Sequence, residues 1–347
     1  MRLILDPAEE AAHAAWLRQT PGAYEWWYFD ARSADGLWAL ACIWFLGNPF
    51  SPYYAEAARG QGGDPFAAPA LFFALYKEGR LHAYHFSQFE GNNAESGVSV
   101  GGPLPTCLRF GPNALALSNG AWQMILADEN ANGRHLDAAL SFTAPPLVSA
   151  AAEGDSFDTD HSWLPAAPFC TVSGQITLRE AHNPGAETIS FEGTGYHDHN
   201  WGRLPFDAAI QDWYWARAAL GGTRAAVLYH VRPKGGKPAL MHLLLFENGE
   251  LRRHETDCRM TLSRRTLSGL GAVYATRLTA SAGDLHAEFA LEKRLDSAPF
   301  YVRALCRATV REGTNEEQGQ GIGEYLCPRM MGWPLVASAM KARIVRR

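Results

Sequence analysis

LYKEGRLHAYHF, residues 75–86, places Lys77, Glu78 and Gly79 between two apolar runs of strand length. A short link that contains glycine commonly reverses the chain between antiparallel strands. The stretch therefore predicts a β-hairpin. ADENANGRHLDAAL, residues 127–140, has the same form with Asn132 and Gly133 at its turn, so we expect hairpins to recur along the chain.

Apolar or alternating runs of strand length follow one another on both sides of this hairpin, with turn residues between them. They cover Leu37–Leu46, Leu71–Tyr76, Leu81–Phe86, Ala114–Leu117, Trp122–Leu126, Leu136–Phe142, Thr171–Leu178, Thr188–Glu192, Ala225–Val231, Ala239–Phe246, Ala272–Thr279, Leu285–Leu291 and Tyr301–Val310. Helical periodicity is restricted to Asp6–Gln19 and Pro334–Arg347. The predicted fold class is all-β with a few short helices.

A weak internal repeat divides the chain. YEWWYF at residues 24–29 can be laid over QDWYWA at residues 211–216, because in both an acid precedes three aromatic residues and a glycine turn follows. We therefore predict two tandem β domains, residues 1–205 and residues 206–347, the second with the terminal helix. Two antiparallel barrels, or two half-open ones packed together, suit this length. A pocket lined by Trp and Tyr would hold one extended apolar molecule.

The composition excludes several classes of function. A formal charge of -5, from 31 Lys and Arg against 36 Asp and Glu, offers no basic surface for nucleic acid. The start, MRLILDPAEE, turns acidic before a signal segment can form, so a cytoplasmic protein is expected. The six cysteines are scattered, which predicts reduced thiols. No phosphate loop or dinucleotide fingerprint stands out, and no cofactor is predicted.

The densest group of titratable side chains is GTGYHDHNWG, residues 193–202. On a strand, alternation divides it into two faces, with His197, His199 and Trp201 on one and Tyr196, Asp198 and Asn200 on the other. In an aromatic pocket the carboxyl group of Asp198 would stay protonated and could donate a proton. The other interpretation is a capped turn in which Asp198 and Asn200 bond only to the backbone.

The His-x-His pattern could also begin a divalent-metal site. A third ligand is not indicated by spacing, although His161, His230 and His242 are candidates. The prediction is that no metal is bound.

The segment from Met330 to Arg347 mixes apolar side chains with basic ones. We expect a helix that either packs on the second barrel with a solvated basic end or makes a peripheral contact with the inner face of a membrane.

Four stretches, in this order, resemble the CrtC/AttH-like lipocalin family and, within it, the carotenoid 1,2-hydratases. They are YEWWYFD at 24–30, GNPFSPYY at 47–54, GYHDHNWG at 195–202 and VLY at 227–229. The resemblance implies two lipocalin-like barrels and a cofactor-independent addition of water across a terminal double bond of an isoprenoid or carotenoid-like substrate. In that chemistry an acid protonates the alkene, a tertiary carbocation forms beside aromatic faces, and water captures it.

The resemblance also implies roles for single residues. Asp198 is the expected proton donor, with His199 as its orienting partner or as the base that activates water. Trp201 is the expected wall beside the cation, and Tyr229 is a second donor or stabiliser. The residues expected to contact the substrate, at a pocket in or beside the first barrel, are Glu25, Trp27, Tyr53, Tyr54, Tyr196, His197, Asn200, Asp212, Tyr214 and Trp215.

One residue departs from the family pattern, because His230 follows Tyr229 where the hydratases tend to carry Asp. Two other functions stay open. One is a cyclase, including a pericyclic one, or an isomerase of a lipophilic polyene, for which orientation alone is enough. The other is a non-catalytic carrier of the lipocalin type. Each function takes a lipophilic small molecule as its partner, and the sequence indicates no oligomeric state.

Overall fold

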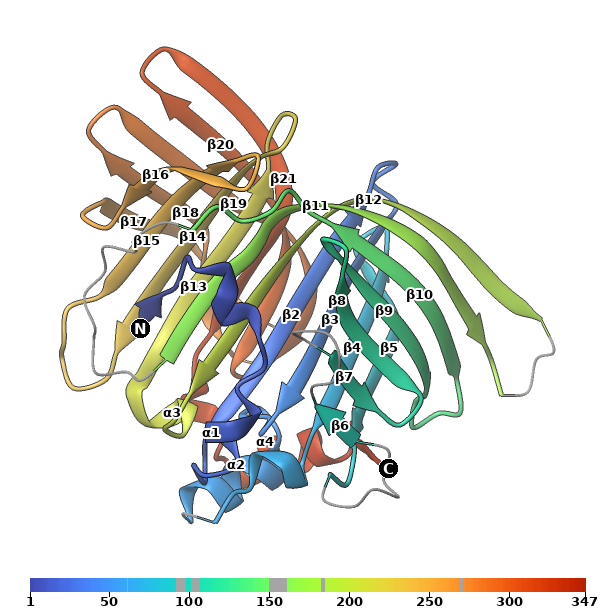
Figure 1. The fold of residues 1–347 in the computed structure, drawn as a ribbon. Helices are drawn as coiled ribbons and strands as arrows, with labels where there is room; N and C mark the ends of the chain where they lie inside the picture. The colour runs from blue at the N-terminus through green and yellow to red at the C-terminus, as the bar shows by residue number, and fades with distance from the viewer. Residues whose placement is uncertain (61, 92–97, 101–106, 150–160, 182–184, 269–270) are drawn as a thin grey trace.

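The computed structural model contains two curled, mostly antiparallel sheets that pack against each other, with short helices gathered at one end (Figure 1). It describes residues 1–60, 62–91, 98–100, 107–149, 161–181, 185–268 and 271–347. The predicted all-β class is confirmed, and the two sheets are half-open barrels.

Within the described residues, the first sheet has 13 strands, nearly all from the first part of the chain. Its order is β22 (Val345–Arg346), β5 (Arg80–Gln88), β4 (Ala70–Lys77), β3 (Trp38–Leu46), β2 (Tyr24–Ser33), β12 (Ala186–Gly202), β11 (His161–Arg179), β10 (His135–Thr143), β9 (Ala121–Glu129), β8 (Asn113–Ser118), β7 (Cys107–Phe110) and β6 (Val98–Val100), with β1 (Arg2–Leu3) paired to β11. The pairs β1–β11 and β22–β5 are parallel. The long strands β11 and β12 therefore lie at the middle of this sheet.

The second sheet has nine strands in the part of the chain that the structure describes. Its order is β16 (Glu250–Glu255), β15 (Leu240–Glu247), β14 (Arg224–Pro233), β13 (Ile210–Ala219), β21 (Asn315–Leu326), β20 (Tyr301–Glu312), β19 (Leu285–Ala298), β18 (Val273–Ala282) and β17 (Arg259–Leu267). The chain changes sheets between Gly202 and Ile210, through the short helix α3 (Phe206–Ala209). The predicted domain boundary after residue 205 falls in this segment and stays a prediction, since β22 returns to the first sheet.

Both predicted hairpin turns lie between paired strands. Lys77 pairs with Arg80 across the first turn, where Glu78 and Gly79 both have positive φ, 48° and 68°. Two successive positive φ values match the right-handed twist of the flanking strands, and glycine adopts such a conformation without a steric penalty. Strands β9 and β10 pair on either side of the second turn.

The helices differ in part from the prediction. They are α1 (Ala14–Leu17), α2 (Pro52–Arg59), α3 and α4 (Pro334–Lys341), with 3-10 turns at Pro7–Glu10, Pro65–Ala67 and Pro328–Met330. The expected single helix over Asp6–Gln19 is wrong, because the segment breaks where Glu10 and His13 bond to side chains of the first sheet. The terminal helix ends at Lys341, and the chain continues into β22. Among the described helices, none has the length and apolar character needed to cross a bilayer.

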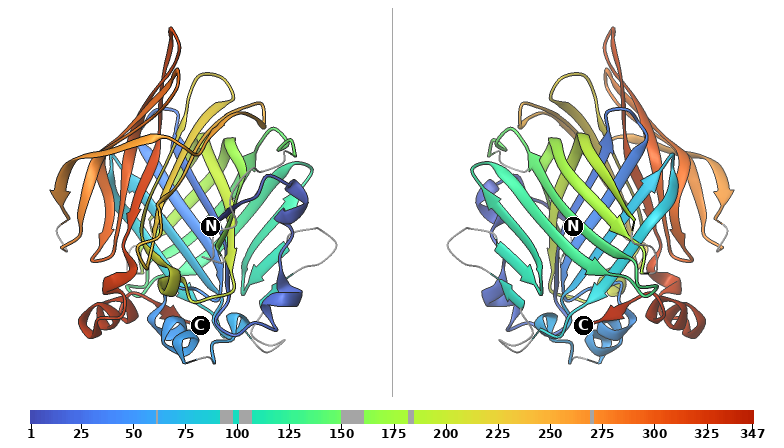
Figure 2. Two further views of the ribbon diagram at one scale, coloured as in Figure 1. Left: turned by 90° about the vertical axis from the view of Figure 1, so that its left-hand side faces the viewer. Right: turned by 90° about the vertical axis from the view of Figure 1, so that its right-hand side faces the viewer.

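Among the described residues, three large apolar clusters form the core, and a small fourth one lies at helix α2. One fills the inside of the first curl and includes Trp27 and Phe29, and another fills the inside of the second curl and includes Tyr214. The third lies between the two sheets, which stand side by side in Figure 2. The aromatic repeat explains how this layer forms. Its matching positions, Trp26 with Trp213 and Tyr28 with Trp215, all belong to the layer between the sheets.

Candidate active site

The carboxyl group of Asp198 lies in the layer between the sheets and is held by three hydrogen bonds. Trp163 Nε1 and the Tyr196 hydroxyl each donate to Oδ2 at 3.0 Å, and Asn200 Nδ2 donates to Oδ1 at 2.7 Å. Tyr196 and Asn200 share a face of β12 with Asp198, as alternation predicts. Trp163 comes from β11, where it pairs with Asn200 in the register of the sheet. These donors fix the orientation of the acid.

Burial changes the acidity of this group. Removal from water disfavours the carboxylate and raises the pKa of Asp198 to about 7, although the hydrogen bonds from Trp163, Tyr196 and Asn200 act in the opposite direction. The donors are uncharged, so they offset only part of the desolvation cost. A carboxylic acid with such a pKa is protonated in much of the population near neutral pH and can act as a general acid.

Asp198 faces a cavity of about 300 Å³, counted as the space between atoms. The lining is otherwise mostly aromatic: Trp26, Tyr28, Asn200, Trp213, Trp215, Tyr229 and Glu324. A larger cavity of about 870 Å³ shares Trp26, Tyr28, Trp213 and Glu324 with it, and extends to Met340 and Arg343 at the helical end. These volumes include space open to solvent. The two cavities adjoin, and they lie between the sheets rather than inside either curl.

Tyr229 belongs to β14 of the second sheet and lines the same small cavity as Asp198. Its ring meets Trp163 edge to face with 4.9 Å between centroids. Its hydroxyl is 3.5 Å from His161 Nε2, and Tyr24 lies 2.9 Å from the other ring nitrogen. Burial lowers the pKa of His161 to about 3, so this imidazole is neutral.

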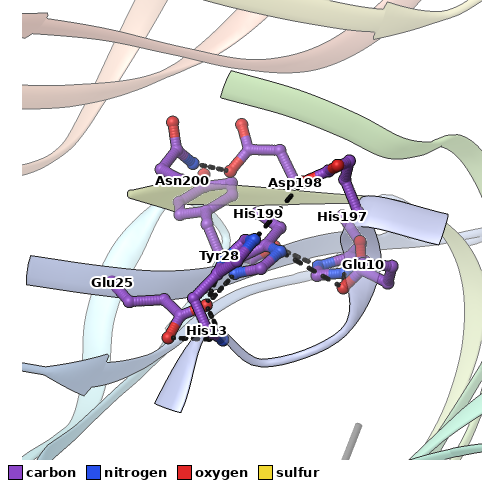
Figure 3. A network of polar contacts seen from close by, with 9 residues as sticks. Glu10, His13, Glu25, Tyr28, His197, Asp198, His199 and Asn200 are labelled. Atoms are coloured by element: carbon purple, nitrogen blue, oxygen red, sulfur yellow. Dashed lines mark hydrogen bonds and ion pairs between the residues drawn. The ribbon is translucent and has the colours of Figure 1, made fainter. Parts of the chain in front are cut away.

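The opposite face of β12 carries a separate polar network, shown in Figure 3. His199 Nε2 and His13 Nδ1 lie 2.8 and 2.9 Å from Glu25 Oε1, and His197 Nε2 lies 3.1 Å from Glu10 Oε1. The interaction of Glu25 with the two imidazoles outweighs desolvation, so the pKa of Glu25 is lowered. Despite burial, these same contacts raise the pKa of His13.

His199 and Trp201 therefore do not meet the acid as expected. His199 bonds to Glu25, and Trp201 packs on His13 and His199 with centroid separations of 4.4 and 4.8 Å. Alternation along β12 is the reason, since residues one apart point to opposite faces. Trp163, Tyr196 and Asn200 occupy the orienting place predicted for His199.

His13, Glu25 and His199 could be considered as metal ligands, because their ligand atoms all lie within 4.8 Å of one another. The backbone N–H of His13 also donates to Glu25, at 3.0 Å. The carboxylate therefore already has hydrogen-bonding partners around it, which is a sufficient account of the cluster. The ligand candidates proposed from the sequence lie elsewhere, with His161 near Tyr229 and His242 bonded to His254 at 2.9 Å.

Several of the other predicted contacts also lie away from the cavities. Trp27 stacks on His199 at 4.5 Å, and the Tyr214 hydroxyl accepts a bond from the backbone of Ala275 within the second curl. Asp212 pairs with Arg232. Tyr53 and Tyr54 lie in the first turn of helix α2, where Tyr53 lies beneath Lys341 and Tyr54 bonds to the carbonyl of Ala23.

His230, the departure from the family pattern, is paired with Tyr214 across β13 and β14. It therefore shares the face of Tyr214 and not that of Tyr229, which lines the cavity. Burial lowers its pKa. The change of residue at this position does not remove an acid from the cavity.

Sequence reasoning missed several residues of the site. The quoted aromatic motifs contain Trp26, Tyr28 and Trp213. The predicted substrate contacts were instead Trp27 and Tyr214, which alternate with them along the strands. The motif that contains Asp198 gives no indication of Trp163 or Glu324, because these two residues come from other strands. Only the register of β11 and the packing of β21 bring these two to the cavity.

Comparison with known proteins identifies relatives of the chain. The model of the family Carotenoid hydratase CrtC matches residues 42–347. A Chlorobaculum tepidum protein named hydroxyneurosporene dehydrogenase is 28% identical over 371 aligned residues, which cover 100% of this chain and 92% of that protein. An acyclic carotenoid 1,2-hydratase of Thiocapsa roseopersicina is 30% identical, covering 83% of this chain and 65% of that protein.

The fold also has a solved counterpart. A crystal structure from Nitrosomonas europaea, provisionally assigned as AttH, matches with a TM-score of 0.64 and 17% identity over 92% of this chain and 95% of that one. This likeness shows that the two chains share a fold over nearly their whole lengths, in agreement with the predicted fold class. The relatives confirm the resemblance seen in the motifs.

Proposed function

The chain belongs to the carotenoid hydratase family CrtC, and from this premise we propose that it adds water across a terminal carbon–carbon double bond of an acyclic isoprenoid or carotenoid-like substrate. Membership in this family makes the chain a hydro-lyase, and the acid mechanism and the substrate are our proposals. The observation that carries them is Asp198, a buried acid with a pKa of about 7 that faces an aromatic cavity.

The chemistry begins with proton transfer. Asp198 donates its proton to the less substituted carbon of the alkene, and the π electrons form the new C–H bond. The other carbon becomes a tertiary cation, which Trp26, Trp213 and Trp215 can stabilise through their ring faces. Water then forms the C–O bond and loses a proton. The sum is alkene plus water giving alcohol, so no electron acceptor is required.

The two adjoining cavities suit a long substrate with one reactive end. The small cavity has room for a terminal branched alkene beside Asp198, and the larger one is lined mainly by apolar side chains that could hold the following chain. Such binding leaves the rest of the molecule to extend toward the helical end, where Met340 and Arg343 lie.

The test is incubation with lycopene or neurosporene in mild detergent and ¹⁸O-labelled water, followed by mass spectrometry. Gain of one labelled water is the expected result. A product of unchanged mass would instead indicate a cyclase or isomerase, and quenching of Trp fluorescence without any product would indicate a carrier. Either outcome would contradict the proposal.

We also propose that helix α4 meets an anionic lipid surface, from which an apolar substrate could enter. Trp333 and Leu335 at its start are 51% and 86% exposed, and the same segment contributes Met340 and Arg343 to the large cavity. Exposed Trp and Leu beside basic residues are typical of interfacial helices.

In flotation with vesicles containing phosphatidylglycerol, Trp333→Ser with Leu335→Ser should reduce binding. Leu267→Ser, at a residue 62% exposed on β17, is the control, and equal binding by all three proteins would exclude this surface.

A further inference from the structure

We propose that Glu324 is the base that takes the proton of the attacking water, so that Asp198 and Glu324 form an acid–base pair built from the two sheets. The inference rests on the hydration proposed above and assigns it a second catalytic residue.

Position is the first argument. Glu324 lies on β21 of the second sheet and Asp198 on β12 of the first, and both line the same cavity of about 300 Å³. Trp26, Tyr28 and Trp213 belong to the same lining. An alkene held among these rings would have a carboxyl group from each sheet within the same small space.

Charge is the second argument. Arg303 Nε donates to Glu324 Oε1 at 2.9 Å, and the Tyr301 hydroxyl donates to the same oxygen. Arg303 is 1% exposed, so Glu324 forms its ion pair with a buried guanidinium. Asp198 receives its three hydrogen bonds from uncharged donors. Two carboxyl groups with such different partners are suited to opposite roles, one as acid and one as base.

The free oxygen of Glu324 is the third argument. Both hydrogen bonds to the carboxylate use Oε1, and within the described part of the chain none is found for Oε2. The residue is 8% exposed, so water in the cavity can reach it. A water bonded to Oε2 is oriented with a lone pair available for the cation.

The steps then balance. Asp198 gives its proton to the alkene and becomes a carboxylate, while the cation forms. The water oxygen bonds to the cation and its proton passes to Glu324. The tertiary alcohol leaves, and Glu324 returns the proton to Asp198 through water, which restores both groups. Without Glu324 the cation can still form, but it collapses mainly by losing a proton back to Asp198.

The experiment uses this difference. With the intact protein and neurosporene in D₂O, we would measure both hydration and the deuterium gained by unreacted substrate. Glu324→Gln should lower the hydration rate about 100-fold, a typical loss for a general base, while deuterium still enters the alkene. Asp198→Asn should lose both signals. Glu316→Gln, an exposed glutamate on the same strand that pairs with Arg311, is the control and should keep both.

The outcomes separate this inference from the proposed function. If Glu324→Gln hydrates at the wild-type rate, or loses hydration and exchange equally while folded, Glu324 is not the base although hydration stands. If the wild type takes up no labelled water, the hydration proposal fails and this inference with it. Should the unpaired Arg303 prevent folding, Arg303→Met with Glu324→Gln removes both charges, and the same two measurements apply.

Discussion

The two faces of β12 each hold a buried carboxyl group in a hydrogen-bonded network, yet their acidities differ in direction. Asp198, between the sheets, is bonded to an indole, a phenol and an amide, and its pKa is raised to about 7. Glu25, on the other face, is bonded to two imidazoles, and its pKa is lowered. Burial is nearly complete for both groups. Burial disfavours both carboxylates, so the difference comes from the partners: the two imidazoles bonded to Glu25 outweigh desolvation, whereas the uncharged donors to Asp198 do not.

Asp198→Asn is the largest expected effect on activity. Loss of the general acid should reduce hydration about 1,000-fold. The thermal midpoint should change little, because the Asn oxygen can still accept from Trp163 and Tyr196, and the Asn200 amide can turn to present its oxygen. Labelled-water incorporation and calorimetry measure the two quantities. A large loss of stability with residual activity would assign Asp198 a structural role.

Glu25→Gln should have the reverse effect. It removes the buried carboxylate to which His13 and His199 are bonded, so we expect the free energy of unfolding to fall by about 3 kcal/mol. Activity per folded molecule should persist, since Glu25 lies on the face away from the cavity. Glu187→Gln, in a partly exposed pair with His82, should cost less than about 1 kcal/mol in the same denaturant titration. Equal losses at the two sites would contradict the comparison.

The contributions of the two carboxyl groups to stability should change with pH in opposite directions. The pKa of Asp198 rises on folding, so its contribution to stability is complete below its ordinary value of 3.8 and is lost as pH rises toward 7. The pKa of Glu25 falls on folding, so its contribution is present above 4.5 and is lost in more acid solution. Denaturant titrations from pH 4 to 8 should therefore show a contribution to the free energy of unfolding that declines as pH rises. Asp198→Asn should lack this contribution, and Glu25→Gln should retain it.

For hydration, kcat/KM should fall as pH rises through about 7.

Tyr196→Phe is the smallest expected effect. It removes one hydrogen bond that favours the Asp198 carboxylate, so the pKa of the acid should rise by up to about one unit. The alkaline limb of the activity profile should shift by the same amount. Tyr214→Phe makes the same chemical change inside the second curl and should leave the profile in place. A shift toward lower pH in Tyr196→Phe would show that the hydroxyl instead favours the neutral acid.

The sequence predicts the local part of this arrangement well. Alternation places Asp198 opposite His199, and turn residues such as Gly79 locate the hairpins, because both follow from backbone geometry within a few residues. The partners of Asp198 on other strands are a different matter. Trp163 meets it through the β11–β12 register, and Glu324 through packing of one sheet on the other. The choice of Trp27 over Trp26 failed for the same reason, since one strand does not reveal which of its faces another sheet will cover.

The pairing of β22 with β5 has a consequence for how the protein is made. Val345 and Arg346 add an edge strand to a sheet whose other members, apart from this strand, all precede residue 203. During synthesis, β22 therefore cannot pair with β5 until the whole second sheet has emerged from the ribosome. We expect early intermediates to expose β5, so the order of translation leaves a temporary site at which two nascent chains could pair wrongly.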